Sequence, residues 1–147
     1  MEKILTMTTR LSKAEYELLA AFRYALRQFL HFSEESARAV GIEPQQHQAL
    51  LAIKGFPERD KITIGELAER LQIRHHSAVG LAGRLVANGL AAREADAEDR
   101  RQVYLALTPH GEALLEQLAA THKEELRRLR PEIHALLARL DESGEPT

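Results

Sequence analysis

Apolar positions along the chain recur mainly at helical spacing, and they predict a protein made mostly of helices. The segment Ser12-Lys13-Ala14-Glu15 fits a capping box, in which a serine and a glutamate three residues later satisfy free N–H groups at a helix start. A long helix should follow and reach about Val40, with Gly41 as its end. Its apolar stripe contains Leu18, Leu19, Phe22, Ala25, Leu26, Phe29, Leu30 and Phe32. A face this wide needs more than one packing partner.

A second wide stripe occupies the C-terminal part of the chain. Thr108 is suited to cap a helix whose first position is Pro109. The apolar positions of this helix are Leu114, Leu115, Leu118, Leu126 and Leu129. Pro131 lacks a backbone N–H and predicts a break or kink, after which residues 133–140 should continue on a final helix. Residues 141–147 should form a flexible tail.

Shorter elements are expected between these two stripes. Pro44 fits the first turn of a helix that runs to Lys54 and ends at Gly55. Residues 61–63 could add a short strand to a nearby sheet. Thr63 and Glu66 then form another capping box and begin a short helix that stops near residue 72.

The next helix should run from about residue 74 or 75 to Asn88, where Gly89 supplies a left-handed helix end. It has a buried stripe of Ala78, Leu81, Ala82 and Leu85. Two short helices joined by a tight turn predict a helix-turn-helix. Residues 90–93 and 101–107 then flank a polar loop, and alternation along residues 102–107 predicts a β-hairpin, or wing. The fold class is thus mainly α with a small β-wing.

The face opposite the buried stripe is the main functional signal. It contains His76, Val79, Gly80 and Gly83, flanked by Ser77 and Arg84. Two glycines inside a helix cost roughly 1 kcal/mol each relative to alanine, but they allow another molecule to approach the backbone closely. The major groove of DNA admits such a helix, and base contacts come from its N-terminal end, where His75, His76 and Ser77 lie. The alternative is a helix packed against another protein helix.

Charge supports DNA as the partner, although the net charge of the whole chain is only −2. No acidic residue occurs between Arg70 and Arg93, while Arg74 and Arg84 also lie in this stretch. A local positive field suits phosphate contacts from one face. In the wing, Arg93, Arg100 and Arg101 could reach phosphates or the minor groove, and Asp99 could orient Arg101.

Several segments also resemble one known family. They are Leu67-Ala68-Glu69-Arg70-Leu71, Asp99-Arg100-Arg101 and Leu105-Ala106-Leu107-Thr108-Pro109-His110-Gly111. These segments resemble the MarR family of bacterial transcription regulators. The resemblance implies a homodimer that binds a palindromic double-stranded DNA operator, usually as a repressor that responds to a small aromatic or phenolic ligand. It implies a single domain over 1–147, with dimerisation helices at 11–41 and 109–140 and a winged helix-turn-helix at 44–108.

The exposed face of the second helix and the family resemblance together indicate which residues contact DNA. The family often has a polar or basic pair in the middle of the recognition helix, whereas this chain has Val79-Gly80. Base contacts should therefore fall on the first turn. The expected DNA-contacting residues are Arg74, His75, His76, Ser77, Val79, Gly80, Arg84, Arg93, Arg100 and Arg101. A ligand pocket near Phe29, His31 and His47 is also implied, although His47 could instead be a core histidine bonded to a backbone carbonyl.

Composition excludes several other functions. Cysteine is absent, which excludes disulfides, thiolate zinc sites and cysteine-based sensing of peroxide within this chain. No secretory signal or membrane-spanning run is evident, so we expect a cytoplasmic protein that does not enter a membrane. Glycine-rich phosphate loops, nucleophile elbows and HExxH motifs are missing, so no enzyme activity and no cofactor are expected.

Two alternative functions stay open from the sequence. None of the seven histidines forms a pair at i, i+3 or i, i+4, so no metal site is predicted, but a metal-sensing regulator is retained as an alternative. The other alternative is a dimeric ligand- or protein-binding module that has lost DNA binding, which Val79-Gly80 and the acidic wing tip would favour. The operator, the effector and the choice between repression and activation cannot be read from the sequence.

Overall fold

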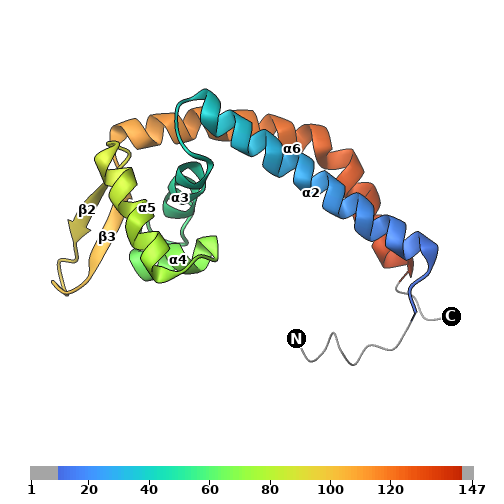
Figure 1. Ribbon diagram of the computed structural model, residues 1–147, viewed down its shortest axis with the longest axis horizontal. Coiled ribbons are helices and arrows are strands. Elements are labelled where there is room, and N and C mark those ends of the chain that lie inside the picture. The colour runs from blue at the N-terminus through green and yellow to red at the C-terminus, as the bar shows by residue number, and fades with distance from the viewer. Residues whose placement is uncertain (1–9, 144–147) are drawn as a thin grey trace. The chain divides into compact units, whose positions relative to one another are not determined.

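The computed structural model describes residues 10–143, and its elements are helices and one small antiparallel sheet (Figure 1). Residue contacts divide the chain into two compact units. The first unit contains the chain up to His31 and from Glu124 onward, and the second contains Phe32–Lys123. Within residues 10–143, no helix is both long enough and apolar enough to cross a membrane.

The first unit consists of the N-terminal part of α2 (Lys13–Ala39) and the C-terminal part of α6 (Pro109–Ser143). Its capping box is present, because the Glu15 N–H donates to Ser12 Oγ at 3.2 Å and the Ser12 N–H donates to Glu15 Oε1 at 3.3 Å. The predicted long helix is therefore confirmed, and Gly41 follows its end with a φ of +85°. Leu18, Ala25 and Leu129 are the buried apolar side chains described in this unit.

The predicted break at Pro131 is wrong, because α6 continues as one helix from Pro109 to Ser143. A proline inside a helix removes one hydrogen bond, and packing on both sides of it can offset that loss. Leu129 is buried before Pro131, and Leu136 and Leu137 line an apolar groove with α2 after it. Of the flexible tail expected from residue 141, residues 141–143 are the last residues of α6, and residues 144–147 lie outside the described part of the chain.

The second unit contains the helix-turn-helix and the wing. Its helices are α3 (Pro44–Lys54), α4 (Ile64–Leu71) and α5 (His75–Ala87), followed by the start of α6. Its sheet has the order β1-β3-β2, from strands β1 (Lys61–Thr63), β2 (Ala91–Ala95) and β3 (Val103–Leu107). Ile62 of β1 and Arg93 of β2 both pair with Leu105 of β3. The largest apolar side chains fully buried in this unit are Leu50, Ile53, Ile62, Leu67, Leu81, Leu85, Leu90, Leu105 and Leu118.

Most elements of this unit follow the sequence predictions. The strand at residues 61–63 and both helices of the helix-turn-helix are confirmed. The hairpin is displaced by one or two residues from the predicted 90–93 and 101–107. The alternation predicted along β3 is confirmed at Leu105, which is buried, but not at Val103, which is 42% exposed. Val103 pairs with Ala95 at the end of the hairpin that lies away from the core. Its side chain is therefore not covered by other residues of the unit.

A cluster of arginine and aromatic side chains fastens the loop before β1 to α4. Glu66 closes the capping box by accepting the Thr63 N–H at 2.8 Å, and its other carboxylate oxygen forms an ion pair with Arg59. The Arg59 guanidinium lies 4.4 Å from the centre of the Phe56 ring and 5.1 Å from that of Tyr104 on β3. One side chain therefore connects the loop, the start of the helix-turn-helix and the wing.

The turn between the wing and α6 is closed by backbone contacts with the end of α5. Gly89 has a φ of +69°, which favours glycine, and its carbonyl accepts the Thr108 hydroxyl at 2.5 Å. The Thr108 N–H donates to the Leu90 carbonyl at 3.1 Å, and the Gly111 N–H donates to Thr108 Oγ1 at 3.1 Å. A Cβ on Gly111 would overlap the Leu90 carbonyl, so the close approach requires glycine at this position.

Candidate nucleic-acid interface

Helix α5 presents two chemically different faces. Ala78, Leu81, Ala82 and Leu85 are fully buried, as the predicted stripe requires. His75, His76 and Gly80 are exposed on the other side, Val79 is 49% exposed and Ser77 is half-buried. The face that was predicted to contact bases is therefore available at the surface of the protein.

The N-terminus of α5 is suited to contact with an anion. The helix follows Arg74, whose side chain does not cap it, and its first turn contains no acidic residue. Backbone N–H groups in a first turn have no partner within the helix, and the helix dipole makes this end positive. The exposed side chains of Arg74, His75 and His76 add hydrogen-bond donors at the same end.

Internal packing does not account for the two glycines of α5. A Cβ at Gly83 would meet nothing within 4 Å among the described residues, and one at Gly80 would meet only the Arg84 guanidinium at 3.5 Å, an ordinary contact. Neither position has a positive φ. The protein fold itself would therefore accept alanine at both positions.

Arg84, one of the predicted DNA-contacting residues, is paired with other residues of the protein. Its Nε is 3.4 Å from Glu43 Oε2, and its Nη2 is 3.5 Å from Gln45 Oε1, so the side chain lies against the first turn of α3. The predicted DNA contact by Arg84 stays a prediction, and it would require the guanidinium to leave this ion pair.

The loop of the wing contains both acidic and basic residues, and its two aspartates accept hydrogen bonds from other residues of the loop. Asp99 Oδ1 accepts the Arg101 backbone N–H at 3.1 Å and the Arg101 Nε–H at 3.3 Å, which is the contact expected from the sequence. Asp96 Oδ1 accepts the Glu98 N–H at 2.9 Å. Arg93, Arg100 and Arg101 are exposed, and Figure 1 shows the hairpin beside α5.

His47 is buried, with only 4% of its surface exposed, in contact with two residues that the sequence analysis did not connect with it. Its Nδ1 lies 3.5 Å from Ser33 Oγ, and the same oxygen lies 2.8 Å from His122 Nε2. The two imidazole rings are 4.7 Å apart between centres. Burial, followed by the charge of His122, lowers the pKa of His47 from 6.5 to about 4. His47 is thus a core histidine, bonded to a hydroxyl instead of a backbone carbonyl.

The other predicted ligand residues lie in the first unit. Phe29 lines an apolar cavity of about 140 Å³ with residues that include Phe22, Leu126 and Leu129, whereas His31 is exposed. A groove of about 240 Å³ is lined only by apolar residues, among them Leu19, Phe22 and Leu137. Among residues 10–143, no group of three or more histidine or acidic side chains is placed to bind a metal ion.

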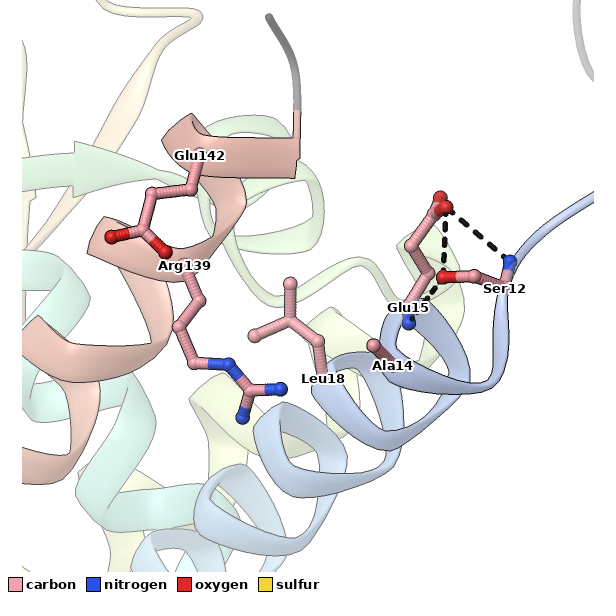
Figure 2. Close-up of a pocket in the computed structure, with 6 residues that line it drawn as sticks. All are labelled: Ser12, Ala14, Glu15, Leu18, Arg139 and Glu142. Carbon is pink, nitrogen blue, oxygen red and sulfur yellow. Dashed lines mark hydrogen bonds between the residues drawn. The ribbon is translucent and has the colours of Figure 1, made fainter.

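A more polar cavity, of about 420 Å³, lies at the end of the first unit (Figure 2). Its lining residues are Ser12, Ala14, Glu15, Leu18, Arg139 and Glu142. Figure 2 shows the Arg139 side chain extending from α6 toward Leu18, while Glu15 is bonded to Ser12. Glu15 and Ser12 are therefore already used by the helix cap.

Comparison with known proteins agrees with this geometry. A family model described as MarR family matches residues 40–102. The chain is similar to the HTH-type transcriptional repressor MdtR of Bacillus subtilis (strain 168), with 30% identity over 89 residues that cover 60% of this chain and 56% of that protein. The chain thus spans little more than half the length of this curated relative.

Solved structures resemble the whole described fold. AbsC, a MarR family transcriptional regulator from Streptomyces coelicolor, matches with a TM-score of 0.72 and 22% identity over 95% of each chain. A point mutant of S. aureus MepR, bound to an oligodeoxyribonucleotide, matches with a TM-score of 0.65 and 19% identity over 92% of this chain and 100% of that chain. The winged helix-turn-helix segment is thus similar to the MarR family, and the described chain shares the fold of a solved MarR family structure.

Proposed function

We propose that this protein is a DNA-binding transcription regulator that binds a twofold-symmetric operator as a homodimer. The observation that supports this most directly is the outer face of α5. It combines exposed first-turn histidines with the exposed Gly80 and the half-buried Gly83, two glycines that internal packing does not require. A small-residue face lets a helix backbone approach the floor of the major groove. MepR, which shares this fold, has been solved with bound DNA.

The proposed contacts divide into two classes. His75, His76 and Ser77 read base edges in the major groove, with Val79 and Gly80 at the point of closest approach. Arg74, Arg93, Arg100 and Arg101 contact phosphates, which positions the protein without reading sequence. Arg84 belongs to this second class only if it exchanges Glu43 for a phosphate.

Homodimerisation would cover the apolar surface of the first unit. Several large side chains there are at least two-fifths exposed: Tyr16, Leu19, Phe22, Tyr24, Leu26, Leu30, Leu126, Leu137 and Leu140. Exposed large apolar side chains in this number usually mark an interface. The terminal helices of a second copy present the same surface, as a twofold interface requires. Light scattering at micromolar concentration should show a dimer, and a lone monomer would contradict this assignment.

Regulation by a small aromatic or phenolic ligand, with repression as the output, is the finer part of the proposal. The apolar cavity lined by Phe29 is suited to an aromatic ring, and the similar protein MdtR is named as a repressor. His31 and His47 stay sequence-based candidates for ligand contact, and His47 would have to exchange its bond with Ser33 for one with a ligand.

The deciding experiment is fluorescence anisotropy with the DNA upstream of the protein's own gene, compared with a random duplex, at two salt concentrations. Tight and selective binding that falls steeply with salt would support an operator-binding regulator that contacts phosphates. Weak and equal binding to the two duplexes would lead to the same measurement on DNA fragments that tile the surrounding region. Weak binding to all of these fragments would instead favour a module that has lost DNA binding. The same assay then tests phenolic compounds for release of the DNA.

A further inference from the structure

The wing leaves the three-stranded sheet at Tyr104. β1 ends at Thr63, which pairs with Tyr104, and residues 95–103 beyond this pair consist of the outer ends of β2 and β3 and the loop between them. Among the described residues, the hydrogen bonds and ion pairs of residues 95–103 all stay within the hairpin. A two-stranded hairpin is marginally stable by itself, so the direction of this outer wing is set where it joins the rest of the unit.

Tyr104 belongs to an alternating series of cationic and aromatic side chains, which we call the cation–aromatic ladder. Lys61 Nζ lies 4.6 Å from the centre of the Tyr104 ring, and the Arg59 guanidinium lies 5.1 Å from the same centre. Arg59 also lies 4.4 Å from the centre of the Phe56 ring, and Arg70 lies 4.9 Å from it. All four distances are short enough for a cation–π interaction. The ladder therefore runs without interruption from α4 to the sheet.

The ladder connects the outer wing to the helix-turn-helix. Its middle cation, Arg59, forms an ion pair with Glu66, whose carboxylate also closes the N-terminal cap of α4. Helix α4 packs against α5, and Leu67 of α4 and Leu81 of α5 are buried in the same core. The orientation of the outer wing relative to the recognition helix is therefore coupled to the contacts of Tyr104.

A small change of orientation at Tyr104 is enlarged at the arginines of the loop. Arg101 lies three residues before Tyr104, which is roughly 10 Å along a strand. A tilt of about 20° at Tyr104 would move Arg101 by roughly 3 Å, which is enough to break a hydrogen bond to a phosphate. Within residues 10–143, the Arg101 side chain is bonded only to Asp99 of the same loop, so this bond cannot restore its position relative to α5.

We propose that Tyr104, Arg59 and Phe56 are positioning residues for DNA binding. The ladder holds the outer wing at the angle at which Arg100 and Arg101 reach phosphates while α5 lies in the major groove. This inference rests on the DNA-binding function proposed above. The cations of the ladder could also contact phosphates directly, so the test uses substitutions of its two aromatic residues, which change no charge.

The first test measures the orientation of the wing without DNA. The chain contains no cysteine, so two introduced cysteines can be spin-labelled selectively. Glu69→Cys on α4 and Ala97→Cys in the wing loop are both at exposed positions. Pulsed electron paramagnetic resonance then gives the distribution of distances between the labels, with labelled protein diluted into unlabelled protein so that distances within one protomer dominate.

Tyr104→Ile, which keeps a strand-forming side chain but removes the ring, should broaden this distribution roughly twofold. Tyr104→Phe, which retains the ring, should leave the distribution as narrow as in the labelled parent protein. An equally narrow distribution in Tyr104→Ile would overturn the inference, whether or not the protein binds DNA.

The second test measures DNA affinity by anisotropy at several salt concentrations. Each phosphate contact contributes on the order of tenfold to affinity at about 0.1 M salt and about 0.9 to the slope of log affinity against log salt concentration. Tyr104→Ile should therefore weaken binding to operator and random DNA by roughly tenfold and lower the slope toward that of Arg100→Ala/Arg101→Ala, which loses about 2. Phe56→Leu, at the other aromatic position of the ladder, should act in the same direction.

A mutant cycle separates this role from a general loss of stability. In the Arg100→Ala/Arg101→Ala background, Tyr104→Ile should have no further effect on affinity, because the ladder acts through these two arginines. A further loss in that background, or a loss in the wild-type background with an unchanged salt slope, would show a merely structural role and overturn the inference. Failure of the wild type to bind the operator at any salt concentration would refute the proposed function instead, and the spin-label distances would still test the ladder.

Discussion

Replacing Gly111 with alanine should destabilise this protein, because the backbone of α6 approaches the backbone of the α5–β2 turn too closely for a side chain. The new Cβ would overlap the Leu90 carbonyl oxygen, and the carbonyl carbon and Cα of the same residue lie within 3.3 Å of it. All of these are backbone atoms, so no side-chain rotation can relieve the overlap. The start of α6 must move away from the turn.

The magnitude follows from the contacts that this movement stretches. Three hydrogen bonds close the turn: Thr108 N–H to Leu90 O, Thr108 Oγ1–H to Gly89 O, and Gly111 N–H to Thr108 Oγ1. Losing two of them costs about 2 kcal/mol, at about 1 kcal/mol net for each bond. Strain from the extra carbon adds about 2 kcal/mol, and the better helix propensity of alanine returns about 1 kcal/mol. The expected loss is about 3 kcal/mol in the free energy of unfolding.

Gly83→Ala is the matched control, because the same substitution in α5 meets open space. It should stabilise the protein by about 0.5–1 kcal/mol through helix propensity alone. Urea denaturation followed by circular dichroism, at one fixed protein concentration, measures both variants, since the stability of a dimer depends on concentration. A urea midpoint for Gly111→Ala equal to or above that of the wild type would refute the packing argument.

Three further predictions concern DNA contact and pH. Arg101→Ala should weaken binding to operator and random DNA alike and reduce the slope of log affinity against log salt concentration by about 1. His76→Ala should instead remove about 1 kcal/mol of discrimination between the two duplexes. Equal losses on both duplexes for His76→Ala would contradict base reading. Gly80→Ala should stabilise the fold by about 0.5–1 kcal/mol yet weaken operator binding, and unchanged affinity would contradict close approach to DNA. Because the pKa of His47 falls from 6.5 to about 4 on folding, its contribution to stability is complete above about pH 6.5 and is lost as pH falls toward about 4, by up to about 3 kcal/mol. His47→Gln should remove this acid sensitivity in denaturation curves measured across that range, and the exposed variant His76→Gln should retain it.

The sequence predicted the features that depend on neighbouring residues. Both capping boxes, at Ser12 and at Thr63, are present, because each needs only residues three positions apart. The buried stripe of α5 was predictable for the same reason. The predicted helix break at Pro131 was wrong because it depended on the local effect of proline alone, whereas Leu129 and the residues after Pro131 pack along the helix.

The features that were missed join distant parts of the chain. Ser33 lies 14 residues from His47 and 89 residues from His122, and no pattern in the sequence connects them. Arg84 was predicted as a cation available for DNA, but its partner Glu43 is the N-cap residue of α3, about 40 residues earlier in the chain. Periodicity identifies which face of a helix is buried, whereas the pairing of individual polar side chains depends on how the helices cross.

The separation of a buried face and an exposed face on α5 also has an evolutionary consequence. The side chains that maintain the fold are on one face of the helix, and His75, His76, Val79 and Gly80 are exposed on the other. Exposed positions away from caps and ion pairs usually change stability by less than about 0.5 kcal/mol when substituted. A duplicated copy of this gene could therefore acquire a new operator through substitutions at these positions without first losing its ability to fold. The same four codons are the natural choice for a randomised library that selects regulators with new targets.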